Sequence, residues 1–86
     1  MKCFIEFQRW GDRDDRERWV WEGTEPDLLQ RVNDYVDATD MCVRQMWHLP
    51  DDFPHVGFLN QEQYTAARSL MNAEFRKKLL TKLDLN

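Results

Sequence analysis

The spacing of apolar residues between positions 24 and 48 constrains this 86-residue chain more than any other feature. These residues recur three and four positions apart, which is the period of one face of an α-helix. The stripe consists of Leu28, Leu29, Val32, Tyr35, Val36, Thr39, Cys42, Val43, Met46 and Trp47. The pattern predicts one long amphipathic helix over residues 25–48, which begins at an N-cap formed by Thr24 with Asp27 and stops before Pro50.

A rival interpretation ends this helix near Ala38 and makes residues 41–49 a third strand. One face of that strand would then carry Met41, Val43, Trp47 and Leu49. Gln45 interrupts the alternation that such a strand requires, whereas the helical stripe keeps its phase as far as Trp47. The long helix is therefore the expectation, and the third strand is the alternative.

The N-terminal part of the chain has the two-residue period of β-structure. Cys3, Ile5 and Phe7 alternate with Lys2, Phe4, Glu6 and Gln8, and residues 18–22 (RWVWE) are rich in aromatic and β-branched residues. The charged segment 11–17 between them reads as a solvated loop, so the pair predicts a β-hairpin.

The C-terminal part predicts a second helix. Asn60 and Gln63 form a capping-box-like start, after which the apolar stripe is Tyr64, Ala67, Leu70, Met71, Phe75 and Leu79. Residues 1–86 are thus expected to form a single compact α+β domain, in which an N-terminal β-hairpin packs on two α-helices (ββαα). The alternative is ββαβα, with the third strand at 41–49.

Composition and charge narrow the classes of function. No apolar run approaches the roughly 18 residues of a membrane span, and the charged N-terminus is unlike a signal peptide, so we expect a cytoplasmic protein with no membrane partner. Cys3 and Cys42 occupy apolar-face positions and are expected to be free thiols. The net charge of −4 disfavours nucleic acid, and residues 25–60 carry seven acidic and only two basic side chains.

Catalytic motifs are missing from the sequence. There is no glycine-rich phosphate loop, no nucleophile elbow and no close Cys–His pair, so the chain is expected not to be an enzyme and to need no cofactor. A metal-dependent enzyme using the 48–55 loop is the weakest alternative, with His48, Asp51, Asp52 and His55 as ligands. Structural zinc sites in small domains usually use cysteine, and both cysteines lie elsewhere, so no metal is predicted.

A second alternative is a nucleic-acid-binding regulator that uses the basic C-terminal helix. The cations are Arg76, Lys77, Lys78 and Lys82, with Trp10 or Trp21 as a platform on which a base could stack. A chain with a negative net charge attracts phosphate only if this basic face is well separated from the acidic one. A solvated helix end explains the same residues more simply.

Protein binding is the preferred hypothesis, and its first element is the aromatic hairpin. If Ile5 and Phe7 face the helices, then Phe4 and either Val20 or the pair Trp19 and Trp21 must point the other way. That second face must be covered by the second helix, by the 53–59 loop or by a partner chain. The candidate aromatic contact residues are Trp10, Trp19 and Trp21.

The second element is an acidic helix face formed by Asp27, Asp34 and Asp37 with Asp40 at its edge, although an ordinary solvated helix face would explain the same residues. The candidate contact residues on it are Asp34, Asp37 and Asp40. Carboxylates three residues apart are separated by about 4.5 Å along a helix, which roughly imitates phosphate charge toward a basic groove. We therefore expect a small inhibitor or adaptor whose partner is a protein, for example a nucleic-acid-handling host protein, with a homodimer as another option. A phage origin rests only on association with small size, acidity and the missing catalytic motifs.

Overall fold

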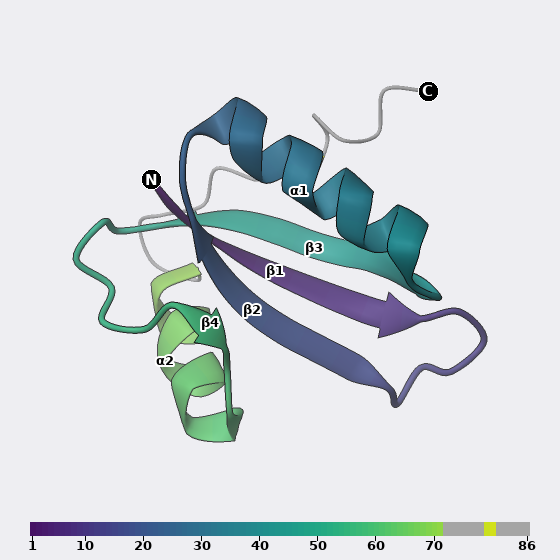
Figure 1. Cartoon of the computed structure of the whole chain (residues 1–86). Helices are drawn as coiled ribbons and strands as arrows, with labels where there is room; N and C mark the ends of the chain where they lie inside the picture. Colours follow the sequence, from purple (N-terminus) through teal and green to yellow (C-terminus); the bar gives the residue numbers. More distant parts are fainter. Residues whose placement is uncertain (72–78, 81–86) are drawn as a thin grey trace.

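The computed structural model describes residues 1–71, 79 and 80 and shows a four-stranded antiparallel sheet with two helices (Figure 1). The elements are β1 (Lys2–Arg9), β2 (Arg16–Glu22), α1 (Glu25–Ala38), β3 (Met41–Leu49), β4 (Gly57–Phe58) and α2 (Gln61–Met71). The strand order is β3-β1-β2-β4. The α+β class and the N-terminal hairpin are confirmed, and the ββαβα alternative describes the order of the main elements, to which the structure adds the short β4.

The prediction of one helix over residues 25–48 is wrong. α1 begins as expected, because the Thr24 side chain accepts a hydrogen bond from the backbone of Asp27, but it ends at Ala38. Thr39 then adopts extended backbone, and its hydroxyl donates to the carbonyl of Tyr35. From Met41 the chain pairs with β1 along its full length, so the second half of the apolar stripe belongs to a strand.

A β-bulge explains why this strand resembled a helix. The register between β1 and β3 shifts between Glu6 and Phe7, which pair with Gln45 and Val43 and leave Arg44 as the extra residue. Buried Met41 and Met46 consequently reach the same core although they lie five residues apart. The residues of β3 that face this core are therefore two or three positions apart and do not alternate strictly. A three-residue spacing also fits a helical stripe.

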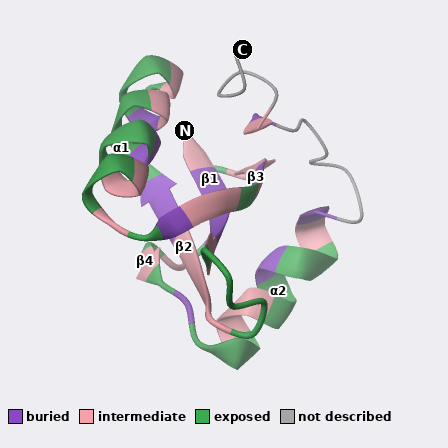
Figure 2. Ribbon diagram, turned by 90° about the vertical axis from the view of Figure 1, so that its right-hand side faces the viewer, coloured by how far each residue is buried: buried purple, intermediate pink, exposed green. Residues whose placement is uncertain are grey.

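The sheet has a hydrophobic core on each face, with α1 over one and α2 over part of the other (Figure 2). The core under α1 contains Cys3, Ile5, Phe7, Trp21, Leu28, Val32, Met41, Met46 and Leu79. The core under α2 contains Phe4, Val20, Leu49, Phe53, Leu59, Ala67 and Met71. It is therefore Phe4 and Val20 that face away from α1, and α2 with the 53–59 loop covers them.

The start of α2 was predicted correctly. The Asn60 side chain accepts from the backbone of Gln63, whose side chain in turn accepts from the backbone of Asn60, which is a reciprocal capping box. Leu79, however, does not belong to the α2 stripe: it lies in the core under α1, and its backbone donates to the carbonyl of Met46. Phe75 lies outside the described residues. Among the residues that are described, no helix is long and apolar enough to cross a membrane.

Candidate functional site

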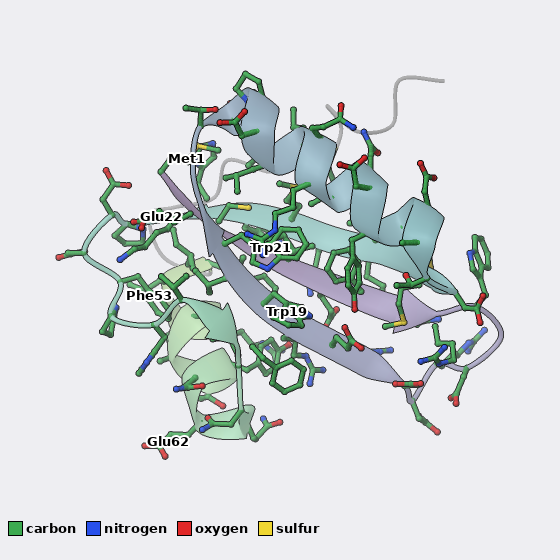
Figure 3. The ribbon with its side chains drawn as sticks, viewed as in Figure 1. Met1, Trp19, Trp21, Glu22, Phe53 and Glu62 are labelled. Carbon is green, nitrogen blue, oxygen red and sulfur yellow. The ribbon has the colours of Figure 1, made fainter. Side chains whose placement is uncertain are left out.

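The three candidate tryptophans lie in three different environments. Trp21 is only 3% exposed and lies between β2 and α1 (Figure 3), with the guanidinium of Arg31 at 4.1 Å from its ring. This side chain is part of the core and offers no surface to a partner in this structure. The expectation that Trp19 and Trp21 could form an uncovered outer face is therefore corrected, because both residues lie on the α1 side of the sheet.

Trp19 is half-buried at the edge of the same core. Its ring packs against Trp21 and Tyr35, and the ring of Phe58 in β4 meets it edge-on at 5.3 Å between centroids. The indole nitrogen donates to Glu17, and so does the hydroxyl of Tyr35. These contacts fix Trp19 in place, so only part of its ring is available to another molecule.

Among the residues that the structure describes, Trp10 is the most exposed of the large hydrophobic side chains, at 73%. It follows β1 directly, and its backbone nitrogen donates to the carbonyl of Asp40 at 2.9 Å. That bond joins the β1–β2 turn to the junction between α1 and β3, which lie at the same end of the sheet (Figure 1). Two residues that the sequence presented separately, Trp10 and Asp40, are thereby neighbours through their backbones.

We call this region the Trp10 end and define it as Trp10, Asp12, Asp14, Asp15 and Asp40. Arg9 lies at its base and forms ion pairs with Asp15 and, at 3.8 Å, with Asp40. The hydrogen bond to Asp15 and the Coulomb attraction of that carboxylate raise the pKa of Arg9 above its ordinary value. Arg13 is also exposed in this turn, so four carboxylates stand against two guanidiniums, those of Arg9 and Arg13, and the Trp10 end keeps a negative excess.

The acidic face of α1 leads toward the Trp10 end. Asp34 and Asp37 are both exposed, and the Asp34 carboxylate accepts a hydrogen bond from Gln30 at 2.9 Å. Neither carboxylate forms an ion pair within the part of the chain that the structure describes. Asp40 lies beyond the helix end, and its side chain is also exposed. The three predicted acidic residues are therefore accessible, although only two of them are helical.

The sequence reasoning missed the buried carboxylate of Glu6. It is 1% exposed at the centre of β1, where it accepts from Arg18 at 2.8 Å and from Gln45 at 3.0 Å and lies 3.4 Å from Arg44. Alternation places Glu6 on the same face as Phe4, beneath α2. The sequence signal for this buried carboxylate was an acidic residue within a strand that carries apolar residues on both faces.

The two alternative sites of the sequence analysis are the metal site in the 48–55 loop and the basic C-terminal helix. The part of the chain that the structure describes contains no group of three or more His, Cys, Asp or Glu side chains that could hold a metal ion. His55 instead packs its ring against Phe53, while Asp51 and Asp52 are exposed in a turn. The basic cluster of Arg76, Lys77, Lys78 and Lys82 lies outside the described residues, so nucleic-acid binding through it stays a prediction.

The two cysteines are free. Burial raises the pKa of the Cys3 thiol to about 12, an effect that the nearby N-terminal charge opposes in part. Since the thiolate is the nucleophilic form, Cys3 is a poor nucleophile at neutral pH and acts as a small core residue. Cys42 donates its thiol to the carbonyl of Gln8.

No protein-family model, curated protein or solved structure matches this chain. Functional reasoning therefore rests on the geometry of the described residues.

The pKa of Tyr35 tests the contact between Tyr35 and Glu17 beside Trp19 at the edge of the core. Burial, the hydrogen bond to Glu17 and the charge of Glu17 raise the pKa of Tyr35 to about 12. The contribution of this tyrosine to stability is present below its unfolded pKa of about 10 and is lost as the pH rises through its folded value. In a Tyr64→Phe background, Glu17→Gln should lower the Tyr35 pKa toward its ordinary value, as measured by tyrosinate absorbance. An unchanged pKa would show that Glu17 does not act on Tyr35.

Proposed function

We propose that this chain is a small acidic protein-binding domain that acts as an inhibitor or adaptor. Its contact surface is the Trp10 end together with Asp34 and Asp37 on α1. The observation that carries the proposal is the 73% exposure of Trp10 directly beside the backbone of Asp40. A large aromatic side chain bordered by carboxylates has the composition of an interface anchor with a charged rim.

The geometry favours Trp10 as the anchor for two reasons. A tryptophan buried at an interface removes roughly 150–250 Å² from water, and this one is exposed before binding. Its backbone is held by the hydrogen bond to Asp40 and by the end of β1, so less conformational freedom is lost on association. By contrast, Trp19 and Trp21 already contribute to the fold.

The carboxylates indicate the kind of partner. Asp34, Asp37 and Asp40 follow one another at three-residue intervals toward Trp10, and the turn adds three further aspartates together with one exposed arginine, Arg13. Such a surface attracts a basic groove and raises the association rate more than it lengthens the life of the complex. A nucleic-acid-handling protein in the cytoplasm, or in a host cytoplasm if the chain is of phage origin, presents that kind of groove. Self-association is the competing arrangement.

Substitutions of Trp10 and of the carboxylates on α1 should change different rate constants of binding. Trp10→Ala is expected to raise the off-rate by about 30-fold, corresponding to the roughly 2 kcal/mol of a hot-spot residue. Asp34→Asn combined with Asp37→Asn should instead slow association, mainly at low salt. The partner would be captured from the proteome of the organism that carries the sequence, and the rates measured by surface plasmon resonance.

Phe58→Ala is the matched control, because Phe58 is also an accessible aromatic residue, 60% exposed against 73% for Trp10, and lies on β4. It should leave both rates unchanged, and the melting temperature of every variant should be compared with that of the parent. If folded Trp10→Ala binds as tightly as the parent while neutralising Arg76, Lys77 and Lys78 abolishes binding, the proposal fails and the basic C-terminal segment is the working surface.

A further inference from the structure

A pocket of about 320 Å³ opens on the face of the sheet opposite α1, beside α2. Three of its lining residues are arginines that come from three different elements: Arg16 from β2, Arg44 from β3 and Arg68 from α2. The lining also includes Trp47, Tyr64 and the buried Glu6. This pocket lies on the other side of the sheet from α1 and does not include Trp10.

Glu6 is the only acidic residue among the described residues of the lining, and its charge is already compensated. Arg18 donates to one of its oxygens at 2.8 Å, and Gln45 donates to the other at 3.0 Å. The Arg18 guanidinium also covers the ring of Tyr64 at 4.0 Å. Arg44 also lies 3.4 Å from Glu6 and shares the charge of this carboxylate. With Arg18 counted, four guanidiniums surround one carboxylate, so Arg16, Arg44 and Arg68 leave the pocket with an excess of positive charge.

Two of these three arginines are held in position. Arg16 donates its Nε to the carbonyl of Arg13 at 2.8 Å, and Arg44 donates an Nη to the side chain of Gln8 at 2.9 Å. A guanidinium has five N–H donors, so each of the two retains others. Arg68 forms no ion pair within the described residues. The pocket therefore presents a partly organised set of N–H donors with excess positive charge, in a chain whose net charge is −4.

We propose that this pocket binds the phosphate group of a small phosphorylated molecule. Arginine forks match phosphate oxygens in a bidentate arrangement, and a terminal phosphate carries close to two negative charges at neutral pH. The volume lies at the lower end of the range of about 300–1,000 Å³ found for small-molecule sites. Trp47 provides a wall against which a sugar or a planar base can pack, whereas the ring of Tyr64 is already covered by Arg18 and stacked on Phe4.

The test uses the whole chain and two-dimensional NMR spectra of its arginine Nε–H and tryptophan indole N–H groups. The probes are inorganic phosphate, glucose 6-phosphate, adenosine monophosphate, adenosine and a short single-stranded oligonucleotide without a terminal phosphate. The three compounds with a free phosphate should shift the signals of Arg16, Arg44 and the Trp47 indole in a saturable way, whereas adenosine should not. The oligonucleotide should bind more weakly than adenosine monophosphate, because its diester phosphates carry one charge each.

Arg16→Gln and Arg68→Gln should each weaken adenosine monophosphate binding by about tenfold, as expected for the loss of a charge-assisted hydrogen bond. Arg31→Gln is the matched control, since it removes the same charge from the opposite face of the sheet, and it should leave the affinity unchanged. The spectrum of each variant shows whether it is folded.

Three results would overturn the proposal. They are an absence of shifts at the pocket with all phosphate compounds, equal weakening by Arg31→Gln and Arg68→Gln, and an oligonucleotide affinity that matches or exceeds that of adenosine monophosphate. The last result would mean that the pocket recognises a nucleic-acid backbone and not a small molecule.

Discussion

Phe7→Ala is expected to lower the free energy of unfolding by about 3–5 kcal/mol. Phe7 is fully buried beneath α1, and its ring lies 4.6 Å from that of Tyr35 and 5.7 Å from that of Trp21 between centroids. Its truncation leaves a cavity at the point where β1, β2 and α1 meet. Small domains are stable by only about 5–15 kcal/mol, so this variant should unfold at a much lower urea concentration than the parent.

Phe58→Ala makes the same chemical deletion at an exposed position and should cost less than about 1 kcal/mol. Urea unfolding followed by far-ultraviolet circular dichroism gives both values. Equal losses for the two variants would mean that the core under α1 does not provide the main packing energy of the sheet.

Arg18→Met is expected to cost about 2–4 kcal/mol, because it leaves the buried Glu6 carboxylate without its closest cation. Arg44, at 3.4 Å from Glu6, and Gln45 remain to compensate part of the charge. Arg16→Met is the control, since Arg16 lies two residues away on the same strand and pairs with no carboxylate in the described residues. It should change stability by less than about 0.5 kcal/mol.

A double variant distinguishes the net contribution of the ion pair between Glu6 and Arg18 to stability from the cost of burying Glu6 without Arg18. Glu6→Leu combined with Arg18→Met removes both charges and should be more stable than Arg18→Met alone. The comparison is made on free energies of unfolding from urea titrations. A double variant less stable than Arg18→Met alone would show that Glu6 stabilises the sheet even without Arg18.

Local signals predicted much of the fold. The period of two in β1, the Thr24 and Asn60 caps and the apolar stripe of α1 are each set by neighbouring residues, so they can be read without knowledge of the tertiary structure. The boundary at Ala38 could not be read in this way. The strand that follows it, β3, pairs with a strand more than thirty residues earlier in the chain, and the bulge at Arg44 in this pairing gives β3 a spacing that resembles a helix.

The candidate site was predicted less completely for a related reason. Burial of Trp21 depends on which face of the hairpin α1 covers, and two assignments fitted the alternation equally well. The contact between Trp10 and Asp40 joins segments thirty residues apart. Likewise, the pocket around Glu6 combines residues of β1, β2, β3 and α2, so no spacing of neighbouring residues in the sequence predicts it.

The central claim is that the Trp10 end contacts the partner, and hydrogen–deuterium exchange on the complex tests it most directly. Binding should slow exchange at residues 9–15 and 37–41 and leave residues 56–61, around the exposed Phe58, unchanged. Protection confined to residues 56–61 or to the basic segment that contains Arg76, Lys77 and Lys78, with none at residues 9–15, would contradict it.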